Sequence, residues 1–331
     1  MLPRPKFCIC LTSAIVAGMS LVWPAFADPV AFDYRGICDA SGAVALDSDH
    51  FAVADDETNT LWIYRRGEPD IVDRLDLSES LKTKPTKEVD LEGAARVGGR
   101  IYWIASHSKD KKKRRRFFAT DIVAGAPPTL QKPPKYSNDL LKEMIAAPGL
   151  AAYDLEDAAA RNDPEQEGAL NIEGLAATPD GDLLIGFRNP IPKGKALIVP
   201  LKNPNKVLKG EKARFGAPVE LDLGGKGIRS IERVGADDLA GYLIVAGPYN
   251  DDGSFALFRW SGASDATPQQ IDAATLLTDL HPEALFAVPG TNEVQILSDD
   301  GGVMVDGTEC KNLEGANEAK KGFRSQVLTL N

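Results

Sequence analysis

Short hydrophobic stretches alternate with polar turns along most of the chain. In one unit, apolar residues 183–187 follow a Pro-Asp-Gly turn at 179–181, and a polar loop separates them from the apolar stretch 196–201. Stretches of this length, bounded by Gly, Pro and Asp, are typical of β-strands. Each such unit therefore predicts most of a small antiparallel sheet.

The unit recurs, and related hexapeptides stand at its head. Residues 90–95 read Asp-Leu-Glu-Gly-Ala-Ala, residues 171–176 read Asn-Ile-Glu-Gly-Leu-Ala, and residues 281–286 read His-Pro-Glu-Ala-Leu-Phe. Two weaker units begin near residues 39 and 227. The spacing is about 50 residues apart from one longer unit, which suits the four-stranded blades of a β-propeller.

The repeat predicts an all-β chain, a β-propeller with five blades. Six blades would fit if the long second unit hid another, and a β-sandwich with coincidental repeats is the alternative. Residues 70–75 and 219–223 would be fourth strands. The last unit lacks a fourth strand after residues 326–330, and we expect residues 29–34 to supply it and close the ring.

Residues 127–167 interrupt the repeat and change its character. The stretches 137–147 and 155–161 have helical patterns, so we expect a helical insertion in the second unit. It would be either decoration or a lid over a site on one face of the disc.

The first 27 residues predict a secretory signal. Arg4 and Lys6 precede an apolar run, and Ala25-Phe-Ala27 forms a small-residue cleavage site. Residues 28–331 would then be one exported propeller domain, periplasmic or secreted, and no later stretch is apolar enough to cross a membrane. Two cysteines would remain, Cys38 and Cys310. A bridge between them would tie the ends of the ring together; two unpaired thiols are the alternative.

The charge balance is acidic. The whole chain has a net charge of −10, and removal of Arg4 and Lys6 brings it to −12, which argues against nucleic acid as a partner. Residues 109–116 run against this trend, with Lys or Arg at all but one position. This basic loop, Lys111 to Arg116 above all, could dock an anion or an envelope partner, or it could be a solvated loop.

Alignment of the units predicts a ring of side chains around the propeller axis. The first strand of a blade lines the axis, so the equivalent head positions should face one another, and they are Ser41, Glu92, Glu173, Arg229 and Glu283. Crowded carboxylates must share protons, pair with a cation or bind a metal. We expect Glu92, Glu173, Glu283 and Asp90 to hold Ca²⁺, or Mg²⁺ with water retained.

The loops after the second strands should lie on the same face. They bring Arg188 and His107 towards the ring, where Arg188 and Arg229 would hold an anion and His107 or His281 would move protons. The alternative is structural, because Asp-Gly sequences form ordinary turns and a Glu can cap backbone amides. No Gly-x-Ser-x-Gly elbow, phosphate loop or His-Glu-x-x-His motif is present in the sequence.

Three segments resemble an uncharacterised family of exported bacterial proteins, a domain of unknown function that covers nearly the whole mature chain. They are residues 90–96, residues 171–176 and the Gly-Phe-Arg-Asn-Pro of residues 186–190. The Glu-Gly heads also resemble those of phytase-like esterase propellers. That wider resemblance implies a propeller, a calcium-supported site and phosphoester hydrolysis.

We therefore expect a divalent-metal-assisted hydrolase or a binder of a small anionic ligand, a phosphoester or carboxylester, at the axial mouth. The alternative is a non-catalytic interaction scaffold that uses the basic loop.

Overall fold

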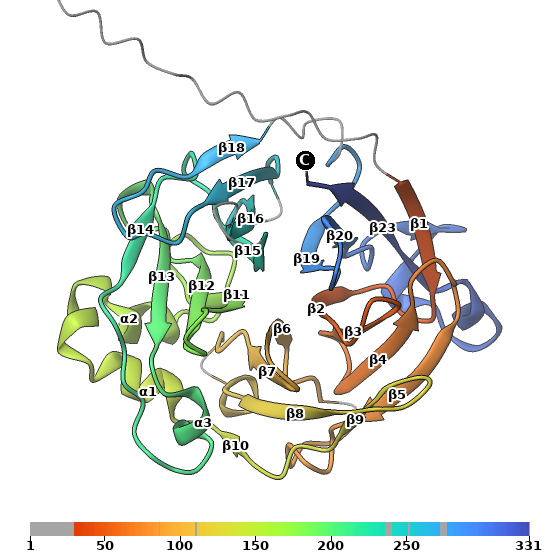
Figure 1. Ribbon diagram of the computed structural model, residues 1–331, viewed down its shortest axis with the longest axis horizontal. Helices are drawn as coiled ribbons and strands as arrows, with labels where there is room; N and C mark the ends of the chain where they lie inside the picture. Colours follow the sequence, from red (N-terminus) through yellow and green to blue (C-terminus); the bar gives the residue numbers. More distant parts are fainter. Residues whose placement is uncertain are drawn as a thin grey trace, which may run out of the picture.

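Five antiparallel sheets surround a central axis in the computed structural model, which describes residues 30–85, 87–109, 111–235, 240–250, 252–271 and 277–330 (Figure 1). The predicted five-bladed propeller is confirmed. The predicted signal, residues 1–27, lies outside the described residues.

In blades one to four, successive strands of the chain lie side by side from the axis outwards. Blade one contains β2 (Ala40–Ala45), β3 (His50–Asp55), β4 (Thr60–Arg65) and β5 (Ile71–Asp76). Blade two contains β6 (Leu91–Val97), β7 (Arg100–Ala105), β8 (Phe117–Val123) and the short β9 (Thr129–Gln131) and β10 (Tyr136–Ser137). Blade three contains β11 (Asn171–Ala177), β12 (Leu183–Asn189), β13 (Ala196–Leu201) and β14 (Val219–Leu221). Blade four contains β15 (Gly227–Val234), β16 (Gly241–Gly247), β17 (Ala256–Trp260) and β18 (Gln269–Ile271).

The fifth blade takes strands from both ends of the chain. Its order is β19 (Pro282–Ala287), β20 (Glu293–Ser298), β23 (Gly322–Thr329) and β1 (Val30–Arg35). Val30 pairs with Val327 and Arg35 with Gly322. The N-terminal strand therefore closes the ring, as predicted from residues 29–34.

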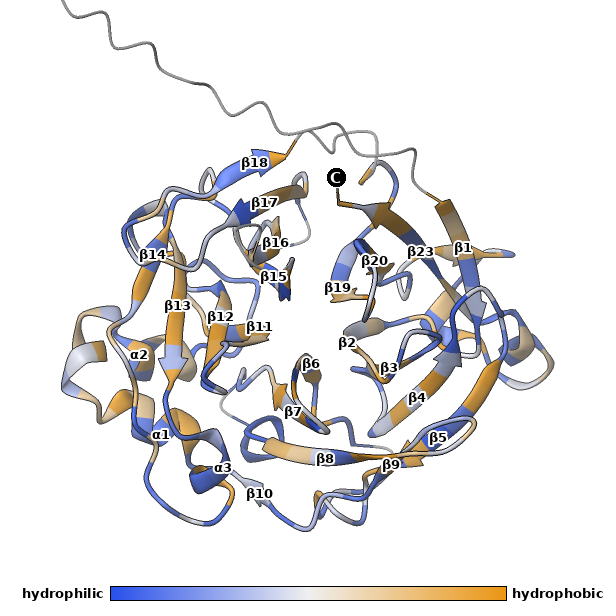
Figure 2. Ribbon diagram, in the orientation of Figure 1, coloured by the Kyte–Doolittle hydropathy of each residue, from blue (hydrophilic) through white to orange (hydrophobic). Residues whose placement is uncertain are grey.

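Hydrophobic side chains fill the wedges between blades. Each of the five junctions has its own buried cluster; that between blades one and two, for example, includes Ile63 and Trp103. Figure 2 shows the difference between buried and outer strands: β13 of blade three is mostly hydrophobic, whereas β18, the outermost strand of blade four, is mostly hydrophilic. The core is thus a ring of five wedges, which couples every blade to two neighbours.

The predicted helical insertion is present at the rim of the disc. Its α-helices are α1 (Leu140–Ile145) and α2 (Leu155–Ala160), and blade three adds α3 (Pro204–Val207) after β13. Leu141 and Leu155 pack into the cluster shared by blades two and three. Figure 1 places α1 and α2 outside the sheets, away from the axis. The insertion covers an outer wedge, so the expectation of a lid over the axis is wrong.

Between β20 and β23 the chain makes an excursion that returns to the start of blade one. It contains the two-stranded hairpin β21 (Met304–Val305) and β22 (Thr308–Glu309) and then Cys310. Cys310 forms a disulfide with Cys38, 272 residues away in sequence. The predicted bridge between the two ends of the ring is confirmed.

Replacing both cysteines by serine should destabilise the protein strongly. In the chain-entropy model, a cross-link that closes so long a loop lowers the entropy of the unfolded chain. This raises the free energy of unfolding by about 5 kcal/mol. Denaturant unfolding of the Cys38→Ser/Cys310→Ser variant should show a free energy lower by up to that amount. A reducing agent should lower the wild type to the level of the variant and leave the variant unaffected. Equal midpoints for the oxidised wild type and the variant would contradict this prediction.

The glycine that follows the ring residue has a packing role in blades one and two. A Cβ built on Gly93 would lie 2.9 Å from the carbonyl oxygen of Glu173 in the next blade. One on Gly42, the equivalent residue of blade one, would lie 3.0 Å from the carbonyl oxygen of Glu92. Inner strands thus approach closely because these positions lack side chains.

Gly93→Ala should therefore lower the free energy of unfolding by about 1–3 kcal/mol, the usual cost of overpacking. Gly99→Ala is the matched control, because a Cβ there meets no atom within 4 Å among the described residues. Thermal or denaturant unfolding measures both. A Gly93 variant as stable as the Gly99 variant would contradict the packing role.

Candidate functional site

A bulge in every inner strand creates the ring that the sequence predicts. In β2, Ala40 pairs with Asp55 and Gly42 with Ala54, which leaves Ser41 outside the ladder. The same skip occurs in the other four inner strands, at Glu92, Glu173, Arg229 and Glu283. A bulge redirects the extra side chain. The five aligned residues of the sequence are therefore the five bulged residues of the structure, and all are buried.

One half of the ring is an ion-pair network. Arg229 Nε lies 3.1 Å from Glu173 Oε2, and Arg229 Nη2 contacts Glu283 Oε1. Arg188, on a second bulge in β12, donates from Nη1 to Glu173 Oε1 over 3.0 Å, and Asn171 Nδ2 donates to the same oxygen over 3.0 Å. Arginine therefore neutralises two of the carboxylates that were predicted to hold a metal, Glu173 and Glu283.

This arginine half retains unused hydrogen-bonding groups. Among the described residues, Arg229 Nη1 has no hydrogen-bond acceptor although it is buried. The Nε contact with Glu173 is close but poorly aligned, so it counts as an ion pair and not as a hydrogen bond. The Arg229 guanidinium also lies over the ring of Phe255, 5.7 Å from its centroid.

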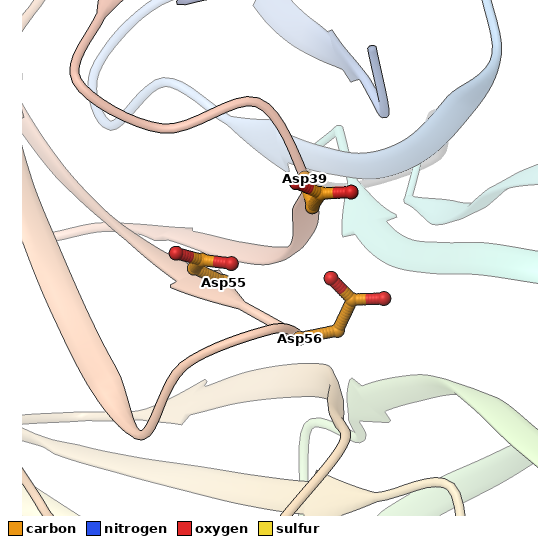
Figure 3. Close-up of side chains that lie close together, drawn as sticks. All are labelled: Asp39, Asp55 and Asp56. Atoms are coloured by element: carbon orange, nitrogen blue, oxygen red, sulfur yellow. The ribbon is translucent and has the colours of Figure 1, made fainter. Parts of the chain in front are cut away.

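The other half of the mouth is acidic. Carboxylate oxygens of Asp39, Asp55 and Asp56 lie within 4.8 Å of one another, and so do those of Asp56, Asp90 and Glu92. Figure 3 shows the first trio at the start of blade one, where Asp39 precedes β2 and Asp56 follows β3. Asp56 belongs to both trios and joins them. We call these five residues the acidic cluster.

Three members of the acidic cluster lack protein partners for their carboxylates. Within the part of the chain that the structure describes, no side-chain hydrogen bond or ion pair involves Asp39, Asp56 or Glu92. Asp39 and Glu92 are 5% and 7% exposed, and Asp56 Oδ1 is buried. Asp55 is better satisfied, since it accepts hydrogen bonds from the Glu57 amide (3.1 Å) and from Thr58 Oγ1 (3.0 Å).

Burial and crowding make these groups difficult to ionise. Burial, and then the neighbouring carboxylates Asp299 and Asp55, raise the pKa of Asp39 to about 8. Burial raises the pKa of Asp55 to about 6. The pKa values of Asp56 and Glu92 are raised well above the ordinary range by burial first and by neighbouring carboxylates second. Without a bound cation, burial and crowding therefore favour the protonated forms of these carboxyl groups.

Asp90 is the member with a cationic partner. It has a positive φ of 63° and accepts hydrogen bonds from Ser106 Oγ and Arg114 Nη1. Arg114 Nη2 also binds Glu88 Oε1 over 2.9 Å. Despite Arg114, burial leaves the pKa of Asp90 above its ordinary value. Arg114, a residue of the basic loop, therefore lies beside the acidic cluster.

The rest of the basic loop is used mainly to fix the second blade. Lys113 pairs with Glu88 over 3.0 Å, and Arg116 Nη1 donates to Asn138 Oδ1 over 2.6 Å. Lys111 and Lys112 are exposed. Docking of an envelope partner through Lys111 to Arg116 stays a prediction, but much of the expected charge is turned inwards.

The two predicted proton carriers occupy different environments. His107 is fully buried with a positive φ of 59°, and its Nδ1 donates to the Ala105 carbonyl over 2.7 Å. Burial lowers the pKa of His107 to about 4, so the ring is neutral. His281 is exposed, and its ring lies 6.3 Å from that of Phe255. Both catalytic roles stay predictions, and only His281 is open to solvent.

The four predicted metal ligands do not include Asp39, Asp55 or Asp56, although alignment of the units places all three on the same face as the ring. The signal was present in the Asp-Asp-Glu sequence that follows β3 and in the position of Asp39 two residues before the ring. Lys311 was also missed; it lies 3.9 Å from Glu57, beside the cluster, because the disulfide holds its loop there.

The fold and this mouth define a five-bladed β-propeller with a charged axial site. The chain belongs to the family described as "Protein of unknown function (DUF3616)", whose model matches residues 40–122 and 129–294. No curated protein matches it in sequence. Among the described residues no helix is long and apolar enough to span a bilayer.

The chain is similar to several solved structures at low sequence identity. Glutaminyl cyclase from Myxococcus xanthus is 14% identical, with a TM-score of 0.47 over 92% of this chain and 98% of that one. The aldose sugar dehydrogenase from Streptomyces coelicolor, in its PQQ-bound form, is 11% identical, with a TM-score of 0.44 over 93% and 99%. A streptogramin B lyase is 11% identical, with a TM-score of 0.38 over 92% and 98%.

The raised pKa values predict an unusual pH dependence for the metal-free protein. In the unfolded chain Asp39 and Asp55 lose their protons near pH 4, but in the fold their pKa values are about 8 and about 6. The folded state therefore binds more protons between pH 4 and pH 8, and the unfolding free energy falls as pH rises through this window.

Melting temperatures of chelator-treated protein between pH 4 and pH 8 test this. In the Asp39→Asn variant, the melting temperature should fall less steeply towards pH 8 than it does in the wild type. A wild-type melting temperature that rises steadily across the same pH window would contradict the raised pKa values of Asp39 and Asp55.

Proposed function

We propose that this protein binds a divalent cation, with Ca²⁺ as the first candidate, and through it a small anionic ligand at the axial mouth. The observation that carries the proposal is the acidic cluster, in which Asp39 and Glu92 are buried without protein partners for their carboxylates. Such groups are stable only when protonated or when a cation compensates them.

The donor set favours calcium. Carboxylate oxygens are the ligands of hard cations, and Ca²⁺ accepts irregular sets of six to eight oxygens more readily than Mg²⁺ does. Asp56, Asp90 and Glu92 would hold the ion, and Asp39 and Asp55 would complete the surroundings. Zinc is disfavoured, because no histidine belongs to either carboxylate trio.

The arginine half supports the binding of an anion. Arg229 Nη1 is a buried donor with no acceptor among the described residues, and a guanidinium is well suited to carboxylate or phosphate oxygens. Arg188 and Arg229 would orient the anion. When bound, a divalent cation supplies a Lewis acid that favours ester hydrolysis, and the solvent-exposed His281 is the group that could move a proton. Phosphoester or carboxylester hydrolysis is thus the reaction that we propose for this mouth.

The disulfide supports a proposal for the compartment. Bridges persist in oxidising environments, and Cys38–Cys310 joins the two ends of the ring. We therefore infer that the protein works in the periplasm or outside the cell.

Isothermal titration with CaCl₂ tests the cation site. Protein first stripped of metal should bind Ca²⁺, and Glu92→Gln should weaken binding at least tenfold, because one carboxylate ligand is lost. Glu156→Gln, an exposed position on α2, is the matched control and should bind as the wild type does. Folding of each variant is checked by circular dichroism.

Unchanged calcium affinity in Glu92→Gln would remove the proposal. If calcium binds as expected, a screen of phosphoesters and carboxylesters with and without calcium then separates an enzyme from a binder. In that screen Arg229→Gln should lose turnover while retaining calcium.

A further inference from the structure

The opposite axial mouth has a ring of its own. Four residues beyond each bulged position, the inner strands carry Ala45, Arg96, Ala177, Arg233 and Ala287. Three small side chains leave space around two large cationic ones. The result is a cavity of about 470 Å³ that residues of all five inner strands line. Four residues of strand correspond to roughly 13 Å, so this cavity is separate from the acidic cluster.

Arg96 is held rigidly at this mouth. Its Nε donates to the Gly98 carbonyl over 2.7 Å, and its Nη1 lies 2.9 Å from the carbonyl oxygens of Ala45 and Leu46 in blade one. Among the described residues, Nη2 donates to no protein atom. A guanidinium fixed in this way loses little conformational freedom when its remaining hydrogens bind a ligand.

The second guanidinium is free to move. Arg233 is exposed near the end of β15, and no hydrogen bond or ion pair of its side chain is found within the described ranges. It lines the same cavity as Arg96. Guanidinium groups suit carboxylate and phosphate oxygens, and here two of them line one concave site.

Glu232 adds a carboxyl group to the cavity. It lines the cavity, and both Arg233 and Arg96 act on it electrostatically. Burial nevertheless raises the pKa of Glu232 to about 8, which favours the protonated form of this carboxyl near neutral pH. The cavity therefore keeps an excess of positive charge, and the Glu232 carboxyl can donate a hydrogen bond.

We propose that this cavity is a second ligand site, which binds a small anion through carboxylate or phosphate oxygens held by Arg96 and Arg233. Its volume suits a small organic acid or a phosphate ester, since ligand pockets begin near 300 Å³. The proposal is independent of the calcium site, because it shares no residue with the acidic cluster or the arginine half.

Titration of metal-free protein with sodium acetate and, separately, with sodium phosphate tests the site at pH 7. Sodium chloride keeps the ionic strength constant, so that screening alone produces no signal. At least one of the two probes should bind saturably, and the stronger one identifies the preferred oxyanion. Arg233→Gln should raise its Kd at least tenfold, the usual effect of losing a charge-assisted hydrogen bond.

Arg214→Gln is the matched control. It removes the same charge from another exposed position and should leave the Kd unchanged. Ala287→Leu fills the cavity without a change in charge and should also weaken binding tenfold or more. Glu92→Gln, at the other mouth, should have no effect. Absence of saturable binding by both probes, or an unchanged Kd in Arg233→Gln and Ala287→Leu, would overturn the proposal.

Discussion

Crowding at the axis is the constraint on which the structure depends. Five inner strands converge there, and each neighbouring pair packs directly. The bulges of these strands turn one side chain per blade towards the axis, so charges from different blades meet in little space. The protein resolves this asymmetrically. Arg229 and Arg188 neutralise Glu173 and Glu283 on one side, whereas Glu92 and the aspartates of blade one remain without sufficient cationic partners on the other.

This asymmetry separates the structural from the chemical part of the repeat. The glycines after Glu92 and Glu173 serve the fold, because a Cβ at Gly93 would meet the backbone of the next blade and one at Gly174 would meet the Ile228 side chain. The Glu itself does not serve the fold uniformly. Ser41, at the same position in blade one, places its hydroxyl within 3.2 Å of the Ala54 carbonyl and also contacts the Leu91 carbonyl. A residue at the ring position therefore needs only to satisfy the hydrogen-bonding groups around it. Carboxylates beyond that need indicate a role other than stabilising the fold.

The repeat allowed the fold and the ring to be predicted from the sequence, because period and turn chemistry are local properties. The last unit lacked a fourth strand, which predicted that residues 29–34 close the ring. The same closure brings the two ends of the chain together, which made Cys310 the expected partner of Cys38. Side-chain pairing across the axis was not predictable. Whether Glu173 meets an arginine or a carboxylate depends on blades far apart in sequence. Likewise Arg114 belongs to a basic run that the sequence alone would leave in solvent, and its contacts with Asp90, Ser108 and Glu88 in the fold hold it inside.

The closure of the fifth blade has a consequence for how the molecule is made. A chain that emerges from the ribosome with its amino end first presents β1 long before its partner β23 exists, and Cys38 long before Cys310. The four middle sheets can form in order, but the circle stays open until the last residues arrive. The first strand must therefore remain unpaired throughout synthesis, with its edge accessible to chaperones or to other chains. Protection of that edge, more than the stability of any one blade, would govern the yield of native protein.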